Sequence, residues 1–172
     1  MPVLCYSEKA CLADKYQKAP WECRSISPEH SGTGILMQGG IKLIVLTVDS
    51  DRIRLQNDLK LIKEVLPESI IVGVNTQKEA MSFAEKAACD LVFTDVLLED
   101  GSGLDLAAGI KQMHPETEAI FLADNEIHAA RAYKIHAAGY IVRPLTAERL
   151  KEEVDNLPER HLRPDNRIIR LT

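Results

Sequence analysis

The sequence predicts an α/β protein built on a doubly wound, five-stranded parallel sheet. Three observations lead to this prediction. From Ile41 onward, five short β-rich segments alternate with five helical segments. The strand candidates are almost continuous apolar runs, which are typical of strands buried on both faces of a parallel sheet. The chain has 172 residues, which is enough for one such domain with appendages but too few for two full-sized domains.

Each predicted element has a local reason in the sequence. The helical segments place apolar side chains on one face. Thr76 and Thr146 are suitable N-caps, while Pro67 and Pro115 stop the preceding helices. Helical crossovers between parallel strands are right-handed, and we predict the flavodoxin-like strand order 2-1-3-4-5. In chain order the predicted elements are a strand at 41–48, a helix at 52–65, a strand at 69–74, a helix at 76–87, a strand at 90–94, a helix at 103–113, a strand at 118–122, a helix at 125–137, a strand at 139–142 and a helix at 146–156.

The chain divides into three parts. Residues 1–38 form an N-terminal arm without clean periodicity, and the sequence predicts no role for them. The cysteines and the histidine of this arm lack the two-residue chelate spacing of structural zinc sites. Residues 39–157 form the regular domain. Residues 158–172 resemble a linker, or the start of an output domain that is missing here, and are too short to hold such a domain themselves.

Composition narrows the partners and the compartment. The net charge is −5, which argues against direct nucleic-acid binding by this chain. No apolar stretch approaches the roughly 20 residues of a membrane span, so we expect no membrane association. The N-terminus lacks the pattern of a signal peptide, and the four cysteines are expected to stay reduced. These features together predict a cytoplasmic protein.

Charged residues follow the ends of three predicted strands. Asp49 and Asp51 follow the first strand, Asp95 follows the third, and Arg143 follows the fifth. The first and third strands are neighbours in the predicted order, so their carboxylates converge at one edge of the sheet. Clustered carboxylates repel one another unless a cation bridges them, and oxygen ligands favour Mg²⁺. With Arg143 to offset negative charge, Asp95 is a candidate phosphoryl acceptor.

Other interpretations of these residues remain open. Asp95 could be a turn acid without chemistry, because a fold can outlast the site it once carried. Asp49 and Asp51 could cap the first helix, and this is the favoured role for Asp51. Arg143 could be a solvated strand-end cation. A nucleotide- or flavin-binding function is disfavoured, since no glycine-rich phosphate loop follows the first strand.

Three stretches carry a resemblance to a known family. Residues 44–51 are IVLTVDSD, residues 90–106 are DLVFTDVLLEDGSGLDL, and residues 137–145 are AAGYIVRPL. On these motifs the chain resembles the receiver domain of bacterial two-component response regulators over about two-thirds of its length. The resemblance implies that Asp95 accepts a phosphoryl group from a partner histidine kinase, and that the chain is not itself an enzyme. It also implies a Mg²⁺ site that includes Asp49, Asp95 and the backbone carbonyl of Leu97, with Asp51 as a substitute ligand.

The chain also departs from the family pattern. Ser50 replaces the second of two adjacent metal-binding acids, so we expect Mg²⁺ to bind weakly or not at all. Ala123 stands where the family has a Thr or Ser, and Arg143 replaces the usual lysine. Tyr140 holds the position of the switch aromatic. We therefore expect an atypical receiver that forms a homodimer through its fourth helix, fifth strand and fifth helix. The alternative is a pseudo-receiver that acts as a phosphorylation-independent interaction or dimerisation module.

Overall fold

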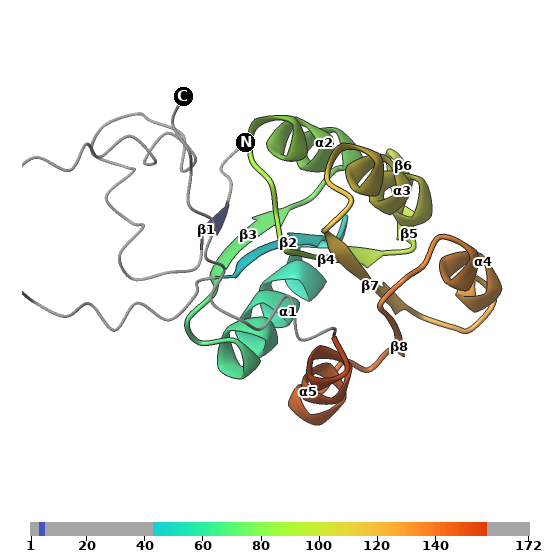
Figure 1. Cartoon of the computed structure of the whole chain (residues 1–172). Coiled ribbons are helices and arrows are strands. Elements are labelled where there is room, and N and C mark those ends of the chain that lie inside the picture. Colours follow the sequence, from blue (N-terminus) through green and yellow to red (C-terminus); the bar gives the residue numbers. More distant parts are fainter. Residues whose placement is uncertain (1–3, 6–42, 158–172) are drawn as a thin grey trace, which may run out of the picture.

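A computed structural model of the chain describes residues 4–5 and 43–157 (Figure 1). Its main sheet has the order β1-β3-β2-β4-β7-β8, in which all neighbours are parallel except β1 and β3. The predicted fold class and the predicted order of the five parallel strands are therefore confirmed. The strands are β1 (Leu4–Cys5), β2 (Ile44–Val48), β3 (Ile70–Val74), β4 (Leu91–Asp95), β5 (Leu97–Leu98), β6 (Gly101–Ser102), β7 (Glu118–Ala123) and β8 (Gly139–Val142). The helices are α1 (Arg52–Val65), α2 (Gln77–Lys86), α3 (Gly103–Met113), α4 (Ala129–Lys134) and α5 (Ala147–Asp155).

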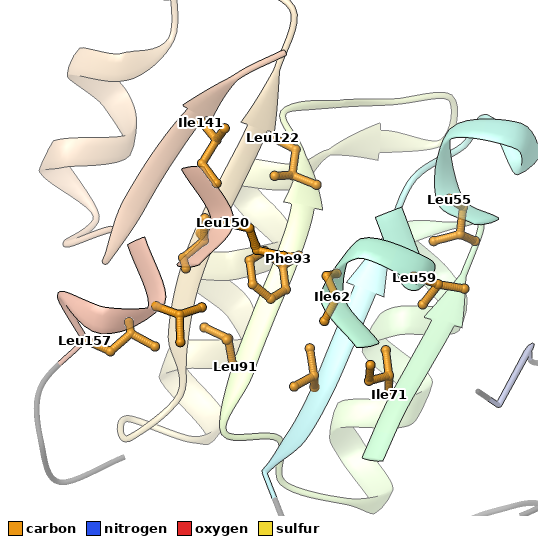
Figure 2. Close-up of a cluster of buried hydrophobic side chains, with 13 residues drawn as sticks. Leu55, Leu59, Ile62, Ile71, Leu91, Phe93, Leu122, Ile141, Leu150 and Leu157 are labelled. Carbon is orange, nitrogen blue, oxygen red and sulfur yellow. The ribbon is translucent and has the colours of Figure 1, made fainter. Parts of the chain in front are cut away.

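Helices cover both faces of the sheet. Helices α1 and α5 contact each other on one face, and α2 and α3 contact each other on the opposite face (Figure 1). Figure 2 shows the core under α1 and α5, where Phe93 of β4 lies among aliphatic side chains from α1, α5 and the neighbouring strands. A second buried cluster lies under α2 and α3 and includes Leu46, Val92 and Phe83. Burial on both faces explains why the central strands are continuous apolar runs.

The helix caps follow the local chemistry of the sequence. Asp51 accepts hydrogen bonds from the backbone N–H groups of Ile53 and Arg54, and α1 has the predicted bounds 52–65. Thr76 accepts from the N–H of Glu79, and Thr146 accepts from the N–H of Arg149. These side chains satisfy backbone donors that lack a partner within the helix.

The structure differs from the predicted elements in several places. Helix α4 runs only from 129 to 134 instead of 125 to 137. Asn125 accepts a hydrogen bond from the N–H of Ile127, and this local turn competes with helix formation. At the other end, His136 has a φ of 55°, a left-handed conformation that ends the helix. The edge strand β1 and the small β5–β6 hairpin were not predicted.

The structure describes little of the two ends of the chain. The N-terminal arm (residues 1–38), apart from Leu4–Cys5, and the predicted linker or start of an output domain (residues 158–172) therefore lie outside the described residues. Within the described residues, no helix has the length and apolar character needed to cross a membrane.

Candidate functional site

Two buried aspartates lie at the carboxyl ends of neighbouring strands. Asp49 follows β2 and Asp95 ends β4, and the two strands pair in parallel up to Val48 and Thr94. The Oδ1 atom of Asp49 accepts a hydrogen bond from the N–H of Asp51 at 2.7 Å. The Oδ1 atom of Asp95 accepts from the N–H of Leu97 at 3.0 Å. The strand order thus brings together the two carboxylates that the sequence predicts to converge.

Arg54 lies between these two carboxylates. Its NH2 nitrogen is 3.1 Å from Oδ1 of Asp49 and 3.0 Å from Oδ2 of Asp95. Its other guanidinium nitrogens approach Asp124 at 3.6 Å and Asp51 at 4.0 Å. Arg54 belongs to the first turn of α1, which starts directly beyond β2. The single guanidinium of Arg54 therefore offsets the negative charge of the carboxylate after β2 and of the carboxylate at the end of β4.

Arg143 follows β8 and reaches the same cluster from the other side. Its NH1 and NH2 nitrogens contact the two oxygens of Asp58 at 3.1 and 2.8 Å, in a bidentate pair. The same NH2 nitrogen is 2.9 Å from Oδ2 of Asp49. The sequence suggested that Arg143 would offset charge at Asp95, whereas the structure pairs it with Asp49 and Asp58.

The electrostatics of the cluster reflect this burial. Burial raises the pKa of Asp49, although the N–H of Asp51 and the charge of Arg54 act in the opposite direction. For Arg143, burial disfavours the charged form, but the hydrogen bonds and charge of Asp58 outweigh it and raise the pKa. The half-buried guanidinium of Arg143 therefore stays charged, and its carboxylate partners offset the free-energy cost of its burial.

The side chains of the two residues after Asp49, Ser50 and Asp51, both accept hydrogen bonds from backbone N–H groups. The side chain of Asp51 caps α1, and the N–H groups of Arg54 and Ile53 lower its pKa. The Oγ atom of Ser50 accepts a hydrogen bond from the N–H of Glu99 at 2.9 Å. Ser50 therefore ties the end of β2 to the turn that follows β4.

These residues do not fit a divalent cation. In the part of the chain that the structure describes, no group of three His, Cys, Asp or Glu side chains could hold a metal ion. The guanidinium of Arg54 already lies between Asp49 and Asp95, and the side chains of Ser50 and Asp51 serve other donors. The carbonyl of Leu97, implied as a further ligand by the family resemblance, stays a prediction.

After β4, the chain turns so tightly that Gly103 lies directly against the backbone of Asp95. A Cβ added at Gly103 would lie 1.9 Å from the carbonyl oxygen of Asp95 and 2.7 Å from Oγ1 of Thr94. Only glycine fits at this first residue of α3. The carboxylate of Asp100 accepts from the N–H groups of Gln77 and Lys78 and so fixes the turn to the start of α2.

The strands beyond β4 carry the predicted response residues. Ala123 ends β7, is buried and has no hydroxyl group. Tyr140 of β8 is half-buried, and its hydroxyl group donates to the carbonyl oxygen of Asn125 at 2.7 Å. Its ring lies near that of Phe121, with the ring centroids 6.5 Å apart. Tyr140 therefore contacts β7 and the loop after it. In the family pattern, a Thr or Ser hydroxyl group stands in this region, at the position that Ala123 occupies here.

Sequence reasoning missed Arg54 and Asp58. A signal for Asp58 was present, because it lies between Leu55 and Ile62 on the apolar face of α1. A charged residue on such a face predicts a buried partner. Arg54 left a weaker signal, its place in the first turn, where side chains lean back toward the helix N-terminus and the strand end.

Comparison with known proteins identifies the family. Residues 45–155 match the family described as the response regulator receiver domain, which is well over half of the chain. The chain belongs to this family. As a member, it is a receiver domain of two-component signalling systems, as its motifs suggested.

Relatives and solved structures agree with this membership. The chain is 31% identical over 113 residues to the sensory transduction protein LytR of Staphylococcus haemolyticus, a match that covers 65% of this chain and 44% of that protein. The chain thus spans less than half the length of this curated relative. A response regulator receiver domain from Clostridium thermocellum shares 26% identity and a TM-score of 0.59, over 66% of this chain and 92% of that one. A receiver domain from Pseudomonas fluorescens, at 22% identity, has a TM-score of 0.64 over 70% of this chain and 98% of that one, which shows the shared fold.

Proposed function

We propose that this receiver domain accepts a phosphoryl group on Asp95 from the phosphohistidine of a partner histidine kinase. The observation that carries the proposal is the placement of Asp95. Its carboxylate ends a central strand of the sheet, is almost fully buried and has a guanidinium nitrogen 3.0 Å from one oxygen. Family membership adds the donor class, because the family resemblance implies transfer from a histidine kinase.

The proposed step is a displacement at phosphorus. One oxygen of the Asp95 carboxylate forms a bond to phosphorus while the bond between phosphorus and the donor imidazole nitrogen breaks. The electron pair of that bond stays on the ring nitrogen, and a proton on the other ring nitrogen makes the leaving group a neutral imidazole. The product is an acyl phosphate. The chain supplies positioning and charge compensation, chiefly through the guanidinium of Arg54 and the N–H of Leu97.

In this proposal the chain is the substrate of a kinase rather than an enzyme, and it works in the cytoplasm. The proposed homodimer uses α4, β8 and α5. Two large apolar side chains support this surface, since Ile127 just before α4 and Tyr133 within α4 are 78% and 83% exposed. Large apolar side chains left exposed on one short stretch of chain are candidates for a contact site.

Intact-mass measurement of the full chain tests the acceptor assignment. After incubation with phosphoramidate, the wild type is expected to gain the mass of one phosphoryl group, and Asp95→Asn is expected to gain none. Asp105→Asn is the matched control, because Asp105 is an exposed aspartate of α3 and should leave the gain unchanged. Equal gains in the wild type and in Asp95→Asn would place the phosphoryl group elsewhere. No gain in the wild type under any condition would favour the phosphorylation-independent interaction module.

A further inference from the structure

The cation of the acceptor site is part of the chain. A single nitrogen of Arg54 contacts Asp49 at 3.1 Å and Asp95 at 3.0 Å, and both side chains are at most 7% exposed. A cation shared between the carboxylates at the ends of β2 and β4 would have to lie in this position. The guanidinium therefore fills the place between the acceptor and its neighbouring acid.

Arg54 is surrounded by negative charge. Besides Asp49 and Asp95, the carboxylates of Asp51 and Asp124 lie within 4.0 Å of its guanidinium nitrogens. A guanidinium is not deprotonated in proteins, so this charge is permanent. The fork also offers several directed donors, which a point charge does not.

The other cation near the site is committed elsewhere. Arg143 makes a bidentate pair with Asp58 and a further contact with Asp49. Within the described part of the chain Arg143 makes no ion pair with Asp95, and it acts on that carboxylate only through longer-range attraction. At the acceptor itself, direct charge compensation therefore falls to Arg54.

The oxygen atoms that a divalent cation would need are also in use. Ser50 brings no carboxylate, and its hydroxyl oxygen accepts from Glu99. The Oδ1 atom of Asp51 accepts from two N–H groups of α1. A metal ion would have to displace a charged guanidinium and then find its ligands among side chains that already have partners.

We propose that Arg54 takes the place of the divalent cation at the phosphoacceptor of this receiver. The site keeps its charge balance without metal, and phosphoryl transfer to Asp95 does not require Mg²⁺. The second part of the proposal rests on the proposed function. The first part does not, because it concerns only which cation the carboxylates bind.

Metal titration tests the first part directly. Binding of Mn²⁺ to the full chain is followed by the paramagnetic resonance signal of the free ion. The wild type is expected to show no saturable binding at millimolar Mn²⁺, whereas Arg54→Ala gains a site that saturates within this concentration range. Adding Ser50→Asp to Arg54→Ala should tighten it further. Arg52→Ala is the control, because Arg52 is an exposed arginine two residues earlier on α1, and it should behave like the wild type.

Two titration results would overturn the proposal. One is saturable Mn²⁺ binding by the wild type that Arg54→Ala does not improve. The other is an Arg54→Ala variant that folds, as judged by its circular dichroism spectrum, and gains no binding. In that case the guanidinium does not stand in a cation site.

Phosphorylation by phosphoramidate tests the second part. The wild type is expected to gain a phosphoryl group at the same rate in excess chelator and in millimolar Mg²⁺. Arg54→Ala should lose at least tenfold in rate in chelator, Arg54→Lys should lose less, and Arg52→Ala should match the wild type. A wild type that is phosphorylated only with Mg²⁺ would contradict metal independence. A wild type that is never phosphorylated would refute the proposed function, while the Mn²⁺ titration would still decide the role of Arg54.

Discussion

The carboxyl-terminal edge of the sheet divides into two halves that differ in their connections. The acceptor half consists of Asp49, Arg54, Asp58 and Asp95, on β2, α1 and β4. Its charged side chains lie within about 3 Å of one another or of Arg143, in a continuous chain of ion pairs. The response half consists of Ala123, Tyr140 and the elements β7, α4 and β8. Around Ala123 and Tyr140 its contacts are apolar or go to backbone atoms, and its ion pairs, Lys111–Glu118 and Arg131–Asp105, involve none of the acceptor-half residues.

This difference indicates that the phosphoryl transfer proposed for Asp95 and a response to it are separate structural problems in this chain. The acceptor half has its charges compensated before any ligand arrives. The response half lacks the hydroxyl group that the family pattern uses to sense the acceptor. A modification shifts a two-state equilibrium only through a differential contact with the two states. The four predictions that follow test how separate the halves are.

The largest expected effect comes from Arg143, which joins the end of β8 to the acceptor half. Arg143→Met leaves Asp49 and Asp58 without this partner, and both are almost fully buried. Breaking a buried ion pair in this way should lower the free energy of unfolding by about 3–5 kcal/mol. Urea denaturation measures the loss. Arg149→Met is the control, because Arg149 is exposed and its side chain donates, among the described residues, to the carbonyl of Val142 alone, so its loss should be about 1 kcal/mol or less. A loss below about 1 kcal/mol for Arg143→Met would mean that the cluster does not depend on this link.

A pair of glycine substitutions compares the tightness of the two halves. In Gly103→Ala the added Cβ would lie 1.9 Å from a backbone oxygen of Asp95. In Gly139→Ala it would lie 2.5 Å from the end of the Glu153 side chain, which can move. Gly103→Ala should therefore cost about 1–3 kcal/mol or more of unfolding free energy, and Gly139→Ala should cost less. Equal losses in parallel urea titrations would show that the response half is packed as rigidly as the acceptor half.

Restoring a hydroxyl group at residue 123 should couple the halves. The association of the wild type, measured by sedimentation, should change by less than about threefold on adding beryllofluoride as a phosphoryl mimic. In Ala123→Ser the change should reach about tenfold, equivalent to about 1.4 kcal/mol of coupling. Serine adds only one oxygen atom at this buried position. A large beryllofluoride effect in the wild type would reveal a route between Asp95 and the dimer surface that does not use this hydroxyl.

The smallest effect concerns the pH dependence of Asp51, the N-cap of α1, which lies beside the acceptor half. The pKa of Asp51 is lowered in the folded chain by the N–H groups of Arg54 and Ile53. The contribution of its charge to stability is therefore present above the ordinary aspartate pKa of about 3.9, and it is lost as pH falls through the lowered value. Asp51→Asn keeps an N-cap but removes the charge. Thermal unfolding should show the wild type slightly more stable than the variant at pH 7, with the difference vanishing as the pH falls below the lowered pKa of Asp51.

Much of the fold could be predicted because its signals are local. The bounds of α1 follow from the spacing of Leu55, Leu59 and Ile62 and from the cap at Asp51. The short α4 could not be predicted from the run of alanines alone, since a turn at Asn125 and a left-handed His136 decide where it starts and ends. Propensity over a few residues loses to such competing local hydrogen bonds.

The candidate site was predictable only in its backbone-determined part. Asp49 and Asp95 follow apolar runs, and the strand order alone brings their positions together. The partners of long charged side chains have no such signal, because a guanidinium can reach several carboxylates from one backbone position. Arg54 and Asp58 therefore became visible as site residues only through their contacts.

The sequence by itself determined the alternation of strands and helices, the parallel sheet, the family and the strand-end position of Asp95, the proposed acceptor. These depend on periodicity, caps and strand ends, which act over a few residues. Only the tertiary structure decided which cation serves which carboxylate. Arg143 pairs with Asp49 and with Asp58, which lies 85 positions earlier in the chain, and Arg54 makes the direct ion pair with Asp95. The reason is physical, because charge compensation depends on distances of about 3 Å between side chains from different elements, and packing alone sets those distances.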